Sequence, residues 1–381
     1  MGTQSYRSYI HAVETHGLEA ALRRARQEVA SHSDYPKVAY LFLDSDGHSQ
    51  DTVWQDFFEH ADEDKYNIYV HRSYPTPEGG KNFLQKFSSY HETPIISSAW
   101  CALMGVQYAL LAAALRDPTN QQFVFISHNT VPFKNFDFIY DDLIGNSMCT
   151  SKFCFASMMG SVYNDCHFFD THRAQRADTL KHHQWIILSR EHSQTVLYEQ
   201  GRQSLNYYDS LRALKDGVYN DPQMCSDETV PSLALILKAK AEKKIVRDVP
   251  ANVFNGLSSI GVEERCTTFA YWARCLQRTP FDLGEKFEAR QGELWHPLSM
   301  SGIPEDYLIM LVNEPSLLFG RKFNEGAFVT TNNGSTINVA DILPKIIHSG
   351  ATFSAKALEE RPLPRLNTAL DGSNPVEGKG T

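Results

Sequence analysis

The feature that most constrains this fold is an alternation of apolar, strand-like runs with helix-like segments. Continuous runs rich in β-branched and aromatic residues are typical of strands buried on both faces of a parallel sheet. Three runs have this character: Lys37–Leu43, Tyr66–His71 and Gln122–Ser127. Helical patterns over 52–60 and 99–115 separate them. This β-α-β-α-β order predicts an α/β fold with a doubly wound mixed sheet flanked by helices, and ligands at the carboxyl ends of its strands.

Shorter patterns continue the same α/β domain, which we expect to span 35–355. The further elements expected are strands over 93–97 and 184–189 and helices over 136–143, 193–209 and 233–237. Residues 144–180 lack a regular period and predict a loop. Residues 1–34 predict an amphipathic helical extension. The last residues, 356–381, include a segment rich in Pro, Gly, Asn and Ser, and they predict a disordered tail.

The composition is that of an ordinary globular protein. Hydrophobic residues make up 42% of the chain and charged residues 21%, and the net charge is −9. A negative total argues against a surface that tracks the phosphates of a nucleic acid. No apolar run reaches the ~20 residues of a membrane span, so no membrane contact is expected. These features fit a cytoplasmic protein, or one of the Golgi lumen if a membrane anchor lies outside this sequence.

The cysteines do not form a recognisable metal motif. All seven occur without a CxxC pair or zinc-ligand spacing. Cys149 and Cys154 are close enough in sequence to bridge if oxidised, and the odd count leaves at least one thiol free. Reduced thiols are favoured, with one or two disulfides as the alternative.

Two adjacent carboxylates, Asp227 and Glu228, stand in a turn of small residues just before the apolar run 233–237. If that run is a helix, Ser226 or Asp227 can cap its start. Glu228 then lies in the first turn, where the helix dipole favours an anion. A solvated helix start explains the pair without any function, so a functional role needs support from other segments.

Polar residues at the predicted strand ends are further candidates. Asp44-Ser45-Asp46 follows the first strand, and such a triplet can hold a divalent cation on the diphosphate of a nucleotide-sugar. A turn that ends the strand is the more common explanation. His71 ends the second strand, where a donor base or ribose would lie, or it is a polar strand end without a ligand. His128-Asn129 follows the strand 122–127 and offers no carboxylate to a metal.

A pair of cations, Arg321-Lys322, lies within the apolar segment 317–323. Two surface bases that extend their charged ends into solvent are the ordinary interpretation. The same pair also suits a diphosphate leaving group. The sequence contains neither a glycine-rich phosphate loop nor the serine-nucleophile motif of hydrolases.

Several separated segments match one family pattern in consistent order, from residue 37 to about 325. These segments are 38–43, 54–58, 66–71, 98–100, 123–127, 131–133, 181–190, 226–228 and 318–323. In them the chain resembles the core-2/I-branching β-1,6-N-acetylglucosaminyltransferase superfamily, closer to its plant branch. Each motif alone is modestly specific, and the ordered set carries the resemblance.

The resemblance implies a GT-A-like fold that transfers a sugar from a UDP-sugar, with inversion and without a metal or other cofactor. The family's base, the second residue of the acidic pair, corresponds to Glu228, and Asp227 orients it. The family lysine on the diphosphate corresponds to Lys322, with Arg321 beside it. The missing carboxylate at His128-Asn129 agrees with a metal-free site.

The resemblance also indicates which residues contact the acceptor, and the chain departs from the family pattern at one position. In the lysine-to-tryptophan segment, Lys181, Gln184 and Trp185 are the candidate acceptor contacts. The animal branch carries an arginine where this chain has a Trp-His-Pro sequence, so His296 is expected to share the phosphate role. The expected partners are a UDP-sugar carrying GlcNAc, xylose or a related sugar, and a glycan, glycoconjugate or small-molecule acceptor.

Three functions are compatible with these residues. The first is inverting, metal-independent transfer, with Glu228 as general base and the two cations stabilising the departing diphosphate. The second is a catalytically silent sugar- or nucleotide-binding protein on the same fold. The third is a metal-dependent transferase that uses Asp44 and Asp46. The first is favoured because the ordered matches surround Glu228 on both sides.

Overall fold

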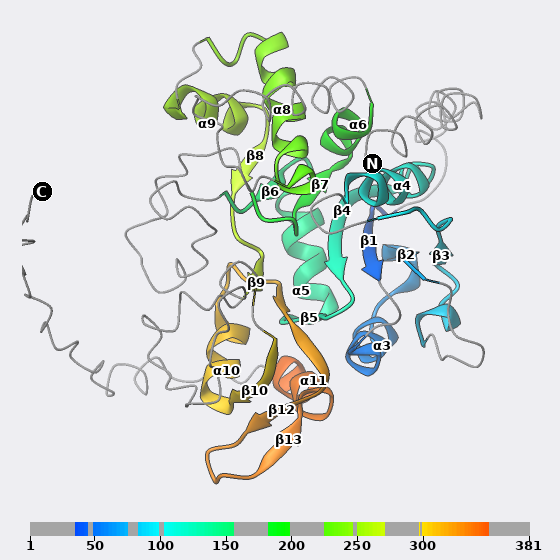
Figure 1. The fold of residues 1–381 in the computed structure, drawn as a ribbon, viewed down its shortest axis with the longest axis vertical. Coiled ribbons are helices and arrows are strands. Elements are labelled where there is room, and N and C mark those ends of the chain that lie inside the picture. Colours follow the sequence, from blue (N-terminus) through cyan, green and yellow to red (C-terminus); the bar gives the residue numbers. More distant parts are fainter. Residues whose placement is uncertain are drawn as a thin grey trace, which may run out of the picture.

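The chain forms a mixed α/β structure around one large sheet (Figure 1). The computed structural model describes residues 35–44, 49–74, 83–98, 103–155, 182–198, 225–246, 250–270, 297 and 299–349. The extension predicted for 1–34 and the tail predicted for 356–381 lie outside these residues.

The large sheet has seven strands within the described part of the chain. In spatial order they are β3 (Tyr90–Glu92), β2 (Tyr66–Arg72), β1 (Lys37–Asp44), β4 (Asn120–Ser127), β7 (Ile187–Ser189), β6 (Ser151–Phe153) and β8 (Val262–Glu264). The first four strands of this order are parallel, whereas β7 runs antiparallel to both β4 and β6. The predicted α/β fold with a mixed sheet is therefore confirmed.

Both faces of β1 are buried, which explains its continuous apolar run. One helical layer consists of α4 (Met104–Ala114), α6 (Arg190–Leu197) and α8 (Val230–Ala241). Ala39, Leu41 and Leu43 of β1 pack against this layer. The opposite layer contains α3 (Asp51–Glu59) and α5 (Phe136–Tyr140), and it packs on Val38, Tyr40 and Phe42. A strand covered on both sides needs no polar face, so its sequence does not alternate.

Two small sheets and three further α-helices complete the part of the chain that the structure describes. One sheet consists of β5 (Thr130–Pro132), β11 (Phe319–Arg321) and β9 (Thr268–Ala270). The other consists of β10 (Met300–Pro304), β12 (Phe323–Thr330) and β13 (Thr336–Asn338). The helices are α9 (Pro250–Ser259), α10 (Glu305–Asn313) and α11 (Val339–Ser349). None of the helices in the described segments has the length and hydrophobicity of a membrane span.

Several predicted boundaries are wrong for local reasons. The strand expected over 93–97 is instead β3, which ends before Pro94, a residue that cannot donate to a ladder. The helix expected from residue 193 begins at Arg190, because the Ser189 side chain accepts a hydrogen bond from the His192 N–H and caps it. The expected loop 144–180 contains β6, which is too short to give a periodic signal.

Two further elements also differ in extent from the expectation. The strand expected over 184–189 is restricted to β7, at its C-terminal half. The helix expected over 136–143 is α-helical only as far as Tyr140, the last residue of α5. A π-helical turn, η3 (Asp141–Gly145), follows directly. The apolar run 233–237 lies inside α8, as predicted.

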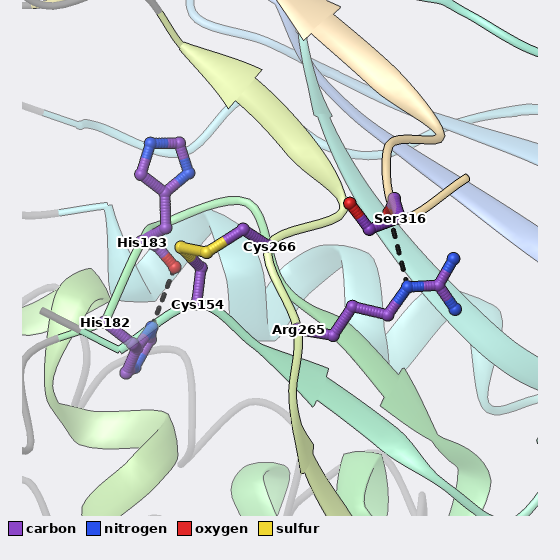
Figure 2. The surroundings of a disulfide bond; sticks show 6 residues. All are labelled: Cys154, His182, His183, Arg265, Cys266 and Ser316. Carbon is purple, nitrogen blue, oxygen red and sulfur yellow. Dashed lines mark hydrogen bonds between the residues drawn. A yellow bond between two sulfur atoms is a disulfide. The ribbon is translucent and has the colours of Figure 1, made fainter. Parts of the chain in front are cut away.

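The cysteines are not all reduced, so the favoured thiol state is wrong. Cys154 and Cys266 form a disulfide that joins the end of β6 to the segment before β9 (Figure 2). Cys225 is also disulfide-bonded. Cys149 is free and exposed. It does not pair with Cys154 because strand β6 separates the two.

Candidate active site

The acidic pair lies in one 3₁₀ turn, η6 (Ser226–Glu228), immediately before α8. Asp227 is buried, and its Oδ1 accepts a hydrogen bond of 3.3 Å from the backbone N–H of Leu103, the residue before α4. A carboxylate is favourable at the N-terminus of a helix, where backbone N–H groups lack partners. Asp227 thus fixes the turn against α4, while Glu228 remains half-exposed.

The predicted capping of α8 by Ser226 or Asp227 is wrong. The N-cap residue of α8 is Thr229, which makes no side-chain capping bond, and Pro231 lies in the first turn. Proline has no N–H and a fixed φ, so it suits a first turn. Glu228 precedes the helix and does not lie in its first turn.

Glu228 is hydrogen-bonded through its backbone to the segment predicted for the acceptor. The carbonyl oxygen of Glu228 accepts a bond of 2.9 Å from the His182 N–H. The next residue, His183, donates its N–H to the Cys154 carbonyl oxygen at 2.7 Å. The disulfide of Cys154 with Cys266 lies beside both histidines (Figure 2). The segment is therefore held between the Glu228 turn and the end of β6.

The His182 ring is a structural element of this segment. It is fully buried, and its Nδ1 lies 2.8 Å from the His183 carbonyl oxygen. Burial lowers the pKa of His182 to about 3, so the ring stays neutral at physiological pH. A neutral ring can donate Nδ1–H to that carbonyl, which stabilises the bend of the chain there.

The predicted donor and acceptor residues meet at one contact. The Arg321 guanidinium lies 4.3 Å from the ring centroid of Trp185, and both side chains are buried. Stacking on an aromatic face is favourable for a guanidinium, and more so away from water. The neighbouring Gln184 has a buried Nε2 without a hydrogen-bond partner in the described part of the chain. Lys181 lies outside the described residues.

The basic pair is positioned at the carboxyl end of β4. In the small sheet, Arg321 of β11 pairs with Thr130 of β5, just beyond that end. The N–H of Phe323 donates to the Asn129 carbonyl oxygen at 2.8 Å. Lys322 therefore lies beside His128-Asn129, where the sequence has no carboxylate for a metal.

Lys322 is a poorly solvated cation. Burial, with a smaller contribution from the Arg321 cation beside it, lowers the pKa of its ammonium to about 8. Among the described residues, no carboxylate lies within ion-pair distance of it. A desolvated cation without a counter-ion gains from binding an anion.

A close approach of two strands fixes the residue before this pair. Gly320 of β11 faces Phe133, and an added Cβ would lie 2.0 Å from the Phe133 Cζ. Phe133 is fully buried, so it has little room to withdraw. Glycine at this position lets β11 reach β5 and brings Arg321 to Trp185.

Two predicted strand-end residues have partners within the protein. The Nε2 of His71 accepts a hydrogen bond of 3.0 Å from the Ile96 N–H, and burial lowers the pKa of His71. The Oδ2 of Asp44 lies 3.9 Å from Nε of Arg72, and both side chains are buried. Asp46 and His296 lie outside the described residues.

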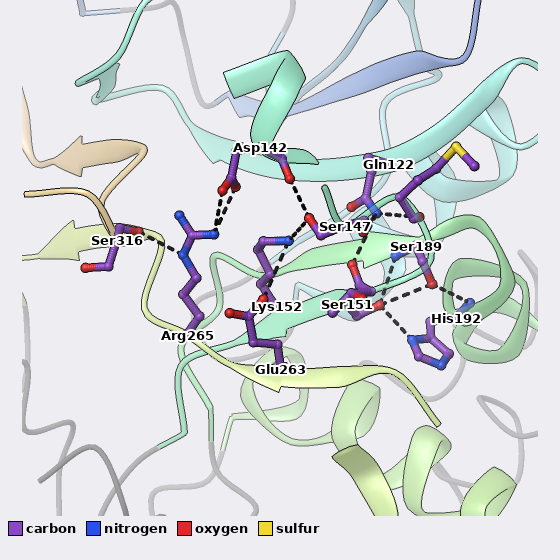
Figure 3. A network of polar contacts seen from close by, with 12 residues as sticks. Gln122, Asp142, Ser147, Ser151, Lys152, Ser189, His192, Glu263, Arg265 and Ser316 are labelled. Atoms are coloured by element: carbon purple, nitrogen blue, oxygen red, sulfur yellow. Dashed lines mark hydrogen bonds and ion pairs between the residues drawn. The ribbon is translucent and has the colours of Figure 1, made fainter. Parts of the chain in front are cut away.

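Sequence reasoning missed a polar network around β6 and β8 (Figure 3). Both carboxylate oxygens of Asp142 lie 2.9 Å from Nη1 of Arg265. The buried ammonium of Lys152 donates to the Ser147 hydroxyl at 2.5 Å and lies 3.8 Å from a Glu263 carboxylate oxygen. These bonds hold β6, β8 and η3 together, and no local sequence pattern marks them.

A second missed residue is Glu264, at the end of β8. Desolvation raises the pKa of Glu264 to about 7, although the residue is exposed to solvent. It pairs with Phe153 across the strands, next to Cys154. A carboxyl group that titrates near neutral pH is suited to proton transfer, so Glu264 is a rival candidate for the base.

A family model described as "Branch: Core-2/I-Branching enzyme" matches residues 38–230, slightly more than half of the chain. Glycosyltransferase BC10 of Oryza sativa subsp. japonica is 26% identical over 177 residues. That match covers 43% of this chain and 41% of the relative, so less than half of the relative's length is represented.

One solved structure was also compared. The apo form of mouse xyloside xylosyltransferase 1 shares 10% identity, over 68% of this chain and 96% of that chain. The TM-score is 0.27, and at this level the likeness carries no weight for fold or function.

Proposed function

This chain belongs to the Core-2/I-branching enzyme family, and we propose that it transfers a sugar from a UDP-sugar to an acceptor hydroxyl. The observation that carries the proposal is the juxtaposition of three features. The Glu228 turn is bonded to His182, Trp185 of the same segment contacts Arg321, and Lys322 follows at the carboxyl end of β4. Strand carboxyl ends are where open α/β sheets bind their ligands.

The basic pair supports binding of the diphosphate. Negative charge builds on the bridging oxygen as the bond from the sugar C1 to the phosphate breaks. Lys322 supplies a desolvated ammonium, and Arg321 supplies a guanidinium whose orientation is fixed by Trp185. Two fixed cations supply the charge stabilisation that a divalent metal supplies in other transferases, so no metal is required.

Glu228 is the proposed general base. It takes the proton of the acceptor hydroxyl while that oxygen bonds to C1 from the face opposite UDP. One bond forms and one breaks in the same displacement, so the anomeric configuration inverts. Asp227 orients the turn through its bond to Leu103 and does not itself accept the proton.

The acceptor side rests on the segment that precedes β7. The Trp185 ring gives a face on which a sugar can stack, and the unsatisfied Nε2 of Gln184 gives a donor for a hydroxyl. Lys181, His296 and His71 complete the proposed set, with His71 on the donor base or ribose. We propose GlcNAc, xylose or a related sugar as the donor sugar, and a glycan, glycoconjugate or small-molecule acceptor.

The metal-dependent alternative through Asp44 and Asp46 is less well supported. Arg72 lies in ion-pair range of the Asp44 carboxylate in a buried setting, and a cation at that carboxylate would displace this contact. The silent-binding alternative keeps the cation pair and gives the base no role. It predicts UDP binding without UDP release.

The test is a UDP-release screen of the full chain with a panel of UDP-sugars and acceptors, in the presence of EDTA. We expect release with one donor class and full activity in EDTA. Loss of activity in EDTA, restored by Mg²⁺ or Mn²⁺, would favour the metal-dependent alternative, and UDP binding without release would favour the silent one.

The base is tested with the matched variants Glu228→Gln and Glu264→Gln. We expect the first to lose turnover by ~10²-fold or more while it retains UDP affinity, and the second to stay near native turnover. If the losses are reversed, Glu264 is the base and the assignment of Glu228 is wrong.

A further inference from the structure

Three potential metal ligands lie close together on α3 and α11, away from Asp227 and Glu228 in the sequence. Asp56 and His60 belong to α3 and its C-cap, one helical turn apart, and His348 lies in the last turn of α11. One donor atom of each side chain lies within 4.8 Å of the other two. The helices α3 and α11 lie side by side (Figure 1), with Val53 and Ile346 in the same buried cluster.

The distances within this triad are close to those of a metal site. Nε2 of His348 lies 2.9 Å from Oδ2 of Asp56, and Nδ1 of His60 lies 3.7 Å from Oδ1 of Asp56. Two ligands bound at ~2.1 Å to a tetrahedral ion are about 3.4 Å apart. The two observed distances lie on either side of that value, so small side-chain shifts would complete the geometry.

The triad is also accessible, because the three side chains are 33–59% exposed. The two imidazole rings are 4.7 Å apart between centroids and are inclined at 50°, so they are not stacked flat against each other. The Nδ1 of His60 also lies 2.8 Å from the Asp56 carbonyl oxygen, so a bound ion would replace that hydrogen bond and the one between His348 and Asp56.

We propose that Asp56, His60 and His348 form a binding site for a divalent transition-metal ion of the Zn²⁺ type. Two imidazoles and one carboxylate suit borderline ions such as Zn²⁺, Ni²⁺ and Cu²⁺, whereas Ca²⁺ and Mg²⁺ prefer all-oxygen sites. A bound ion joins α11 to α3 by coordination, in addition to their apolar contact. The site is independent of the proposed sugar transfer, which uses other elements.

The direct test is calorimetric titration of the tag-free full chain with ZnCl₂ alone. We expect binding of one ion, with affinity reduced by at least ~10-fold in both His348→Gln and His60→Gln. His91→Gln is the matched control, since His91 is exposed, stacks on Tyr69 and belongs to no such triad among the residues that the structure describes. CaCl₂ at the same concentrations should give no comparable signal.

Thermal unfolding gives a second readout that does not depend on activity. An ion that binds only the folded state raises its melting temperature by mass action. We expect Zn²⁺ to raise the melting temperature of the native chain and of His91→Gln, but not of Asp56→Asn or His348→Gln. Equal Zn²⁺ affinity and equal thermal shift in the native chain and in these two variants would overturn the proposal.

Discussion

The guanidinium of Arg321 lies 4.3 Å from the ring centroid of Trp185, although the two residues are 136 positions apart in the sequence. Trp185 precedes β7 of the large sheet, and Arg321 ends β11 of a small sheet. The contact joins the side predicted for the acceptor to the side predicted for the diphosphate. A substitution of Trp185 is therefore expected to affect binding of the diphosphate, and a substitution of Arg321 is expected to affect binding of the acceptor.

Removing the Trp185 ring should weaken UDP binding without contacting UDP directly. A cation–π contact is worth ~0.5–2 kcal/mol, so Trp185→Leu is expected to reduce UDP affinity by about 2- to 30-fold in calorimetry. Trp185→Phe keeps an aromatic face and should fall between the native chain and the leucine variant. Native UDP affinity in Trp185→Leu would show that the stacking does not orient Arg321.

Alkaline pH should weaken UDP binding through Lys322. Its pKa of about 8 lies below the ordinary value for lysine, so the free protein loses this charge as the pH rises through about 8. A bound diphosphate favours the charged form, so the fall in affinity extends to somewhat higher pH. A terminal phosphate has already ionised, near pH 6, and does not contribute.

The matched variant for this prediction is Lys322→Arg, since arginine keeps its charge at any of these pH values. We expect UDP affinity to fall between pH 7 and 9 in the native chain and to stay level in the variant. The same pH profile in both proteins would assign the titration to another group.

Breaking the disulfide should destabilise the fold and loosen the acceptor segment. Cys154 and Cys266 are separated by 112 residues in sequence, and closing a loop of this size restricts the unfolded chain by about 4–5 kcal/mol. The double variant Cys154→Ser, Cys266→Ser is expected to unfold at clearly lower denaturant concentration. Cys149→Ser is the control, because this thiol is free and exposed. An unchanged midpoint in the double variant contradicts the prediction.

A methyl group at Gly320 should disturb the donor side. The added Cβ would lie 2.0 Å from the Phe133 Cζ, and overpacking of this kind costs ~1–3 kcal/mol. Gly320→Ala is expected to lower the melting temperature and to weaken UDP binding. The effect should be smaller when Phe133→Leu makes room. Gly145→Ala is the control, because an added Cβ there meets no atom within 4 Å.

The sequence predicted the parts of this protein that depend on local order. The runs of β1, β2 and β4 were recognised because burial on both faces removes polar residues from a strand, and that pattern is written in consecutive residues. Helix α3 was predicted from an amphipathic pattern, whose apolar residues Val53, Trp54, Phe57 and Phe58 are buried, and the apolar run 233–237 lies inside α8. The turn of Asp227-Glu228 was also visible, since it stands directly before that run.

Elements of three residues were less predictable. β6, β9 and β11 are too short to show a period, and their pairing gives them their conformation. Of these strands, β11 positions the basic pair Arg321-Lys322 that we propose binds the diphosphate. Its sequence suggested only two cations between apolar residues, and its pairing with β5 brought them to the end of β4.

Only the tertiary structure decided which distant residues meet. The sequence suggested that Asp227 caps the following helix, but its carboxylate bonds to Leu103 in front of α4. Cys154 bonds to Cys266 and not to its neighbour Cys149. Asp56 and His60 are one turn apart on any helix, yet their position opposite His348 follows from the packing of α11 on α3. These contacts are non-local: each depends on how whole elements pack, and spacing along one chain carries no such information.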